Sequence, residues 1–129
     1  MKDGLEADRA KFFDGFTRDF FSADGELQVS EAQRQEAIAL CQQSGQAAAL
    51  GCMKAFGTTD FRGDLKKVGV PTLILHGDAD AIVPLEGSGQ RTHAAIAGSE
   101  LVVLQGAPHG CNASHADAFN RALLAFLAN

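Results

Sequence analysis

The stretch that most constrains the fold of this chain is residues 70–80, Val-Pro-Thr-Leu-Ile-Leu-His-Gly-Asp-Ala-Asp. An apolar run that stops at turn residues is typical of a strand buried on both faces of a sheet. In open α/β sheets, the chemistry lies beyond the carboxyl ends of the strands. Residues 101–104, Leu-Val-Val-Leu, repeat the pattern and lead into Pro108-His109-Gly110. We therefore expect two strands that bring an aspartate and a histidine to one sheet edge.

The spacing of apolar runs and turns predicts the order of elements in the second part of the chain. The expected elements are a strand over 70–76, a helix over about 87–97, a strand over 100–105, and a helix over about 114–127 capped by Ser114. A strand–helix–strand unit of this length gives two parallel neighbouring strands. The predicted fold class is therefore α/β, with a β-α-β-α unit over residues 69–129.

Residues 1–68 carry no strand pattern and are predicted to be entirely helical. The expected helices cover 5–22, Ser30 to about Cys41, 47–56, and a short turn over 60–68 that Thr59 can cap. Ser30 and Gln33 have the spacing of a capping box. Five phenylalanines recur at helical spacing in the first helix and predict an apolar face: Phe12, Phe13, Phe16, Phe20 and Phe21.

Composition argues against several classes of function. The net charge of −5 comes with no basic cluster, which disfavours nucleic-acid binding. No apolar run approaches the roughly 20 residues that span a bilayer, and the first residues lack the apolar core of a signal peptide. The three cysteines have no metal-ligand spacing. We therefore expect reduced thiols, a cytoplasmic location and no membrane contact.

A set of motifs resembles the carboxyl-terminal part of an α/β-hydrolase. The motifs are His76-Gly77-Asp78-Ala79-Asp80, Ile82-Val83-Pro84, Ala107-Pro108-His109-Gly110 and Leu124-Ala125-Phe126-Leu127. The subgroup most resembled is the cofactor-free haloperoxidases, arylesterases and perhydrolases. The resemblance implies a partial α/β-hydrolase fold, with a helical cap-like region over 1–68 and the end of the core over 69–129. It implies no cofactor. No metal is expected either, because the candidate ligands lack the fixed spacing of a dedicated zinc site.

The same resemblance implies that Asp80 is the acid of a catalytic triad and His109 its base. A carboxylate at a strand end can accept the imidazole N–H, which leaves the other ring nitrogen free as a base. Asp78 is expected to bond backbone amides in the turn. As an alternative, the Asp80–His109 pair only holds the two strand ends together.

The nucleophile of the family has no counterpart in these 129 residues. The family places it in a Gly-x-Ser-x-Gly elbow, and the chain contains no such motif. Gly87-Ser88-Gly89 has similar letters but does not follow a buried strand. Cys111 lies close to His109 in sequence, but an inert thiol or an intermolecular disulfide is the favoured interpretation. The chain therefore looks like the truncated rear half of a hydrolase.

Three functions fit these observations. The first is a carboxylic-ester hydrolase for a small-molecule ester, in which His109 activates water or a serine from a partner chain. The second is a non-catalytic fragment that only oligomerises. The third is a metal-dependent hydrolase, although a dedicated zinc spacing is missing. Its ligands would come from His76, Asp78, Asp80, His109 and His115.

The expected strand over residues 70–76 indicates that the chain pairs with another polypeptide. If strand 70–76 has no neighbour on its far side, it presents unpaired N–H and C=O groups that favour pairing with another chain. The phenylalanine face of the first helix adds an apolar patch. We therefore expect a homo-oligomer, a two-fold dimer paired through residues 70–76. The alternative partner is a separate chain that carries the front half of a hydrolase.

Overall fold

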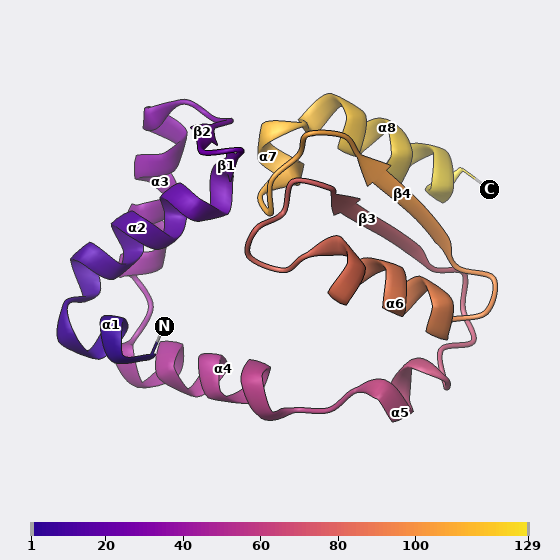
Figure 1. Ribbon diagram of the computed structural model, residues 1–129, viewed down its shortest axis with the longest axis horizontal. Helices are drawn as coiled ribbons and strands as arrows, with labels where there is room; N and C mark the ends of the chain where they lie inside the picture. The colour runs from indigo at the N-terminus through magenta and orange to yellow at the C-terminus, as the bar shows by residue number, and fades with distance from the viewer. Residues whose placement is uncertain (1, 129) are drawn as a thin grey trace.

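The structure is a computed structural model that describes residues 2–128. The helices are α1 (Lys2–Ala7), α2 (Arg9–Phe21), α3 (Glu31–Gln42), α4 (Gln46–Thr58), α5 (Arg62–Leu65), a 3-10 turn η1 (Leu85–Gly87), α6 (Gly89–Ala95), α7 (Cys111–Ser114) and α8 (Ala116–Leu127). The strands are β1 (Ser22–Ala23), β2 (Glu26–Leu27), β3 (Leu73–Gly77) and β4 (Glu100–Leu104). Figure 1 shows α1–α3 on one side and the β3–α8 unit on the other, joined by α4 and α5.

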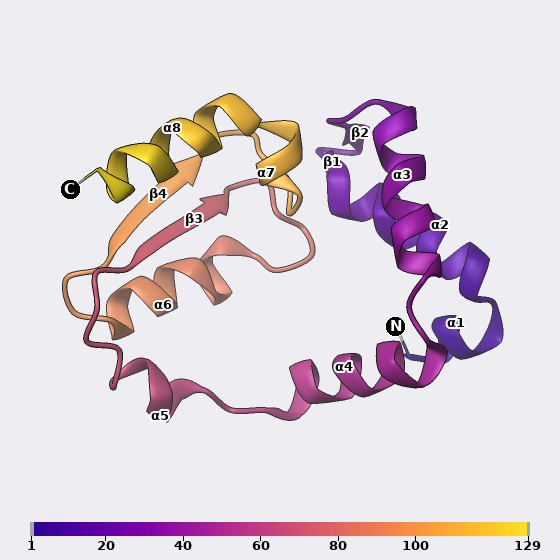
Figure 2. The same ribbon diagram turned by 180° about the vertical axis from the view of Figure 1, so that it is seen from behind.

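The parallel strand pair predicted for the second part of the chain is confirmed. β3 and β4 are parallel, with Leu73 opposite Glu100 and Gly77 opposite Leu104. Helix α6 lies on one side of the pair and α8 on the other, as both views show (Figures 1 and 2). The fold class is therefore α/β, and the carboxyl ends of both strands point toward α2 (Figure 1).

The first strand is shorter and more exposed than the apolar run predicted. It begins at Leu73 rather than Val70, whose exposed fraction is 69%. Of the run before Leu73, Thr72 still reaches β4, because its carbonyl accepts a hydrogen bond from the Glu100 amide at 2.8 Å. Leu73, Ile74 and Leu75 are only half-buried because β3 has a single neighbouring strand within residues 2–128.

The prediction of an entirely helical region over 1–68 is wrong in two places. The first helix divides at Asp8, which caps α2 by accepting a hydrogen bond from the Lys11 amide at 3.0 Å. After α2, β1 and β2 form a small antiparallel hairpin. Asp24 and Gly25 make its turn with φ of 51° and 83°, the paired left-handed conformation of an Asp-Gly hairpin turn.

Helix α3 begins where the sequence predicts it. Ser30 Oγ accepts a hydrogen bond from the Gln33 amide, and the Gln33 side chain accepts one from the Ser30 amide, which completes the capping box. Arg34 anchors α3 to α2: its Nη1 lies 2.9 Å from both the carbonyl and a carboxylate oxygen of Asp14. The Arg34 side chain is 4% exposed.

Other helix ends differ from the prediction. Thr59 ends α4 instead of capping the next helix, because its hydroxyl donates to the Ala55 carbonyl at 2.7 Å. The turn predicted over 60–68 is helical only as α5, and the helix predicted over 87–97 only as η1 and α6. Ser114 does not cap the last helix; it ends α7, and His115 occupies the cap position of α8.

A small apolar cluster fixes the loop after β4. It joins Leu104, Ala107 and Cys111 to half-buried side chains of β4 and α8. The exposed large apolar side chains are Leu40, Phe56, Phe61, Val68, Val70, Val103, Leu124 and Leu127. Among residues 2–128, no helix combines the length and apolar character needed to cross a bilayer.

Candidate active site

The turn after β3 holds Asp80 through the backbone. The amides of Ile82 and Val83 donate to Asp80 Oδ1 at 2.9 and 2.8 Å. The Asp80 side chain is 4% exposed. A buried carboxylate needs such donors, since an unpaired buried charge is costly. Because both amides bind Oδ1, the Oδ2 atom of Asp80 remains available to accept a hydrogen bond from another group.

Two backbone contacts join this turn to the loop after β4. The Ala79 amide donates to the Ala107 carbonyl at 3.1 Å, and the Gly106 amide donates to Asp78 Oδ1 at 2.6 Å. Gly77 lies so close to this loop that a side chain there would meet the Ala107 and Pro108 backbone. Asp78 is thus bound to a backbone amide, as the sequence predicts, although the amide lies in the other loop.

His109 lies against Asp80. Its Nδ1 donates to Asp80 Oδ2 at 2.7 Å, and its side chain is 31% exposed. Because the ionised carboxylate only accepts hydrogen bonds, Nδ1 carries the proton and Nε2 has a free lone pair. Within residues 2–128, no hydrogen bond to Nε2 is formed. The arrangement can therefore accept a proton at Nε2 while Asp80 stabilises the resulting imidazolium.

His76 is closer to this site than the sequence indicated. It lies in β3 rather than in the turn, and its Nε2 donates to the Val83 carbonyl at 2.9 Å. The same nitrogen is 3.3 Å from Asp80 Oδ2. His76 therefore braces the turn that carries Asp80. In the sequence, the contact between His76 and Asp80 is indicated only by their spacing, since His76 lies four residues before Asp80.

The residues proposed as metal ligands do not converge as a group. His76, Asp80 and His109 meet, but His115 Nδ1 lies against the Ser114 hydroxyl at 2.9 Å. Asp78 is occupied by the Gly106 amide. Over the described part of the chain, no three His, Cys, Asp or Glu side chains are arranged to hold a metal ion.

Cys111 has the properties of an inert thiol. It is buried in α7, and burial is the main cause that raises the pKa of its thiol. A raised pKa disfavours the thiolate, which is the nucleophilic form. The side chain instead packs in the cluster with Leu104 and Ala107.

An apolar hollow of about 480 Å³ lies beside the Asp80 turn. It separates one face of α2 from the residues that follow Asp80, and it is lined by Gly4, Lys11, Phe12, Gly15, Phe16, Asp19, Ala81 and Ile82. Its apolar lining comes from Phe12 and Phe16 on one wall and Ile82 on the other. A hydrophobic group could therefore lie against the residues that follow Asp80, although neither Asp80 nor His109 lines this hollow.

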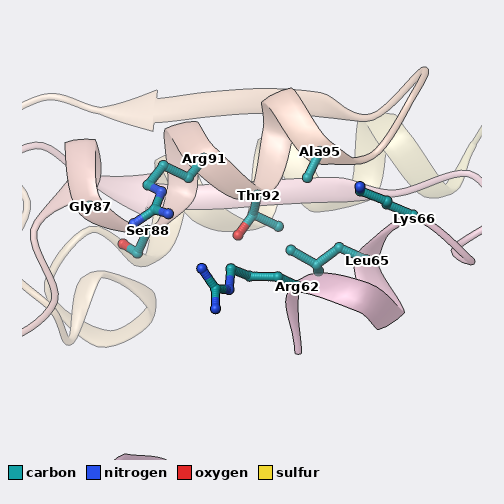
Figure 3. Close-up of a pocket in the computed structure, with 8 residues that line it drawn as sticks. All are labelled: Arg62, Leu65, Lys66, Gly87, Ser88, Arg91, Thr92 and Ala95. Carbon is teal, nitrogen blue, oxygen red and sulfur yellow. The ribbon is translucent and has the colours of Figure 1, made fainter. Parts of the chain in front are cut away.

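A second hollow, between α5 and α6, is of a different kind (Figure 3). It is lined by Arg62, Leu65, Lys66, Gly87, Ser88, Arg91, Thr92 and Ala95. No carboxylate, histidine or cysteine lines it, and its ionisable side chains are the cations Arg62, Lys66 and Arg91. The Arg62 guanidinium is already paired with Asp60 at 2.6 Å.

Two parallel strands that deliver an aspartate and a histidine to one sheet edge are consistent with an α/β-hydrolase. Residues 33–129 match the family model described as TAP-like protein. The chain therefore belongs to this α/β-hydrolase family.

Individual relatives agree with this assignment. The chain is 40% identical over 93% of its length to a putative non-heme chloroperoxidase of Synechocystis sp.. It is 35% identical over 98% of its length to a non-heme chloroperoxidase of Kitasatospora aureofaciens. The match covers 44% and 47% of those proteins. The chain thus spans about half the length of the curated relatives it matches.

Solved structures show the same relation. The crystal structure of a bromoperoxidase from Bacillus anthracis matches with a TM-score of 0.96 and 47% identity. That match covers 99% of this chain and 47% of the bromoperoxidase. An esterase from Exiguobacterium antarcticum matches with a TM-score of 0.90 and 26% identity, over 46% of its chain.

Proposed function

We propose that this chain supplies the acid and the base of a carboxylic-ester hydrolase. Asp80 holds and polarises His109, and His109 acts as general base and then as general acid. The observation that carries the proposal is the 2.7 Å hydrogen bond from His109 Nδ1 to Asp80, which leaves Nε2 unbonded and partly exposed. The names of the relatives, which include an esterase, support ester chemistry.

The proton transfers follow from this geometry. Nε2 takes the proton of an attacking hydroxyl as the new C–O bond forms at the ester carbonyl. The imidazolium is stabilised by Asp80 and then donates the proton to the departing alcohol as the old C–O bond breaks. With water as the attacking hydroxyl, one such cycle converts ester plus water into acid plus alcohol. With a serine, the first cycle releases the alcohol and leaves the acyl group on the serine, and a second cycle with water releases the acid and frees the serine. Neither route has a redox step.

Neither Asp80 nor His109 supplies the attacking hydroxyl, so the nucleophile has to be a third group. These 129 residues contain no Gly-x-Ser-x-Gly motif, so the nucleophile is either water or a serine on another polypeptide segment. With water alone the rate is expected to be weak, because removal of one oxyanion donor already costs about 10²–10³ in rate.

The free edge of β3 supports a serine supplied by a partner. β3 pairs only with β4 among the described residues. The chain superimposes with a TM-score of 0.96 on 47% of a solved bromoperoxidase. We propose that a polypeptide equivalent to the remaining part of such a hydrolase pairs with β3 and brings the nucleophile to His109.

The hollow beside Asp80 supports a small ester with an apolar group. Its walls are formed by phenylalanines of α2 and by Ile82. Burial of such a group stabilises the complex by about 25 cal/mol per Å² of apolar surface. We therefore expect p-nitrophenyl esters with short acyl chains to be suitable test substrates.

Hydrolysis of p-nitrophenyl acetate tests the proposal. The chain is assayed alone and mixed with a polypeptide that corresponds to the unmatched part of the Bacillus anthracis bromoperoxidase. Hydrolysis is expected to be weak alone and faster in the mixture. His109→Ala and Asp80→Asn should each lower the rate of the mixture by about 10²–10⁴, the usual contribution of general acid–base catalysis.

His93→Ala is the matched control, since His93 is an exposed histidine on α6. It should hydrolyse the ester like the unsubstituted chain. If His109→Ala keeps the full rate, the proposed base is wrong. If the unsubstituted chain matches the buffer blank both alone and in the mixture, the non-catalytic fragment is the better description. The observation that favours that second candidate is the missing serine motif.

A further inference from the structure

The end of α2 and the loop that carries His109 are joined by a direct backbone hydrogen bond. The Gly110 amide donates to the Phe20 carbonyl at 2.9 Å. Carbonyls in the last turn of a helix have no partner within the helix. The bond therefore satisfies an end group of α2 and ties the helix to the residue that follows His109.

Gly110 is packed so tightly that any side chain there would force the Phe21 ring to shift. A Cβ placed there would lie 2.5 Å from Phe21 Cε1 and 3.0 Å from Phe20 Cδ1. The Gly110 φ of −77° is accessible to any residue, so the requirement comes from close approach and not from conformation. Phe21 is 8% exposed. The two aromatic rings thus rest on the histidine loop.

Phe20 also touches the imidazole itself. The ring centroids of Phe20 and His109 are 4.7 Å apart and the rings are tilted by 79°, an edge-to-face contact. Phe20 is in turn supported by Phe21 at 4.9 Å and by Phe16 at 5.7 Å between ring centroids. The ring that meets His109 is therefore held by its neighbours on α2.

The bond to Asp80 is the only hydrogen bond that the His109 ring makes among residues 2–128, so the ring can turn about Cβ–Cγ whenever that bond opens. The packing contact with Phe20 opposes this rotation. We propose that Phe20 is a positioning residue for His109: it holds the imidazole plane so that Nδ1 stays on Asp80 and Nε2 keeps one direction. The consequence for catalysis rests on the proposed function, whereas the positioning of the ring does not.

Nuclear magnetic resonance of the histidine side chains tests the positioning directly. Protein with ¹⁵N-labelled histidine is recorded at mildly alkaline pH for the unsubstituted chain, Phe20→Ala, Phe20→Tyr and Phe12→Ala. The unsubstituted chain should show His109 as the fixed Nδ1–H tautomer, with a slowly exchanging Nδ1 proton. Phe20→Ala should average the two tautomer signals and lose that proton, and Phe20→Tyr should restore both.

Phe12→Ala is the matched control. It removes a phenylalanine from the same helix, and its ring contacts are with Phe13 and Phe16, not with His109. Exchange of the Gly110 amide is measured in the same samples, because its bond to the Phe20 carbonyl does not need the phenyl ring. A protected amide with an averaged His109 signal in Phe20→Ala supports the proposal.

Two results would overturn it. The first is a His109 signal in Phe20→Ala that equals that of the unsubstituted chain. The second is a His109 change that occurs only with loss of Gly110 amide protection, which would mean that α2 has undocked. In the ester assay with the complementing polypeptide, Phe20→Ala should lower kcat about tenfold with little change in KM. Failure of the proposed function would appear separately, as full activity in His109→Ala.

Discussion

The carboxylate of Asp80 has a different partner on each oxygen. Oδ1 accepts two backbone amides of its own turn, and Oδ2 accepts the imidazole of His109. Backbone donors do not change when a side chain is replaced. Asp80 should therefore stay in place when His109 is substituted, which makes His109→Ala a clean test of the base.

The ion pair between Arg34 and Glu31 predicts how the stability of the fold depends on pH. Arg34 and then Gln35 donate to the Glu31 carboxylate, and these hydrogen bonds lower the pKa of Glu31 from 4.5 to about 2. A pKa that is lower in the folded state stabilises the fold above the unfolded value and is lost on acidification. The free energy of unfolding should therefore fall as pH decreases from about 4.5 to about 2.

Urea unfolding across this pH range measures the effect. Glu31→Gln should flatten the dependence, because the amide does not titrate. The matched control is Glu36→Gln on the same helix, an exposed residue, which should leave the slope unchanged. A slope that is equal in Glu31→Gln and in the unsubstituted chain would contradict this account.

At the scale of helices and strands, the sequence predicts features that depend on neighbouring residues, but not contacts between residues far apart in the chain. The capping box of α3 needs only Ser30 and Gln33, so the sequence predicted it. The β1–β2 hairpin was missed because strands of two residues have no periodicity, although Asp24-Gly25 was a turn signal. The contact of Phe20 with His109 depends on how α2 docks on the sheet edge, which no local pattern specifies.

The junction of β3 with the turn predicts a glycine requirement. A Cβ at Gly77 would lie 2.6 Å from the Ala107 carbonyl carbon and 2.8 Å from the Pro108 carbonyl oxygen. Neither atom belongs to a flexible side chain, so the loop itself must move. Gly77→Ala should lower the free energy of unfolding by about 1–3 kcal/mol, the usual cost of overpacking.

Chemical denaturation compares this variant with Gly87→Ala. A Cβ at Gly87 meets no atom within 4 Å, so that substitution is expected to change stability little. If the two variants unfold at the same denaturant concentration, the close approach at Gly77 is not rigid. A change in His109 resonances in Gly77→Ala alone would show that the same approach also sets the site.

At the scale of the molecule, β3 is the least complete part of the fold. The Glu100 amide donates to the Thr72 carbonyl, and the Asp78 amide donates to the Leu104 carbonyl. Backbone groups of alternate residues point to opposite sides of a strand, so those of Leu73 and Leu75 face away from β4. Parallel sheets are normally buried, and a two-stranded sheet is marginal. This edge is the proposed seam for a partner.

In the absence of the complementing polypeptide, the second copy of the chain is the available partner. We expect light scattering at micromolar concentration to give twice the 13.5 kDa mass of one chain, with two β3 edges paired about a two-fold axis. Val70→Lys should shift the mass toward the monomer, because it places a charge three residues before β3, beside the two edges that would pair. Leu127→Lys is the control, since Leu127 is equally exposed on α8, at 68% against 69% for Val70. A monomer in the unsubstituted chain, or a dimer that Val70→Lys leaves intact, rules out this edge as the seam.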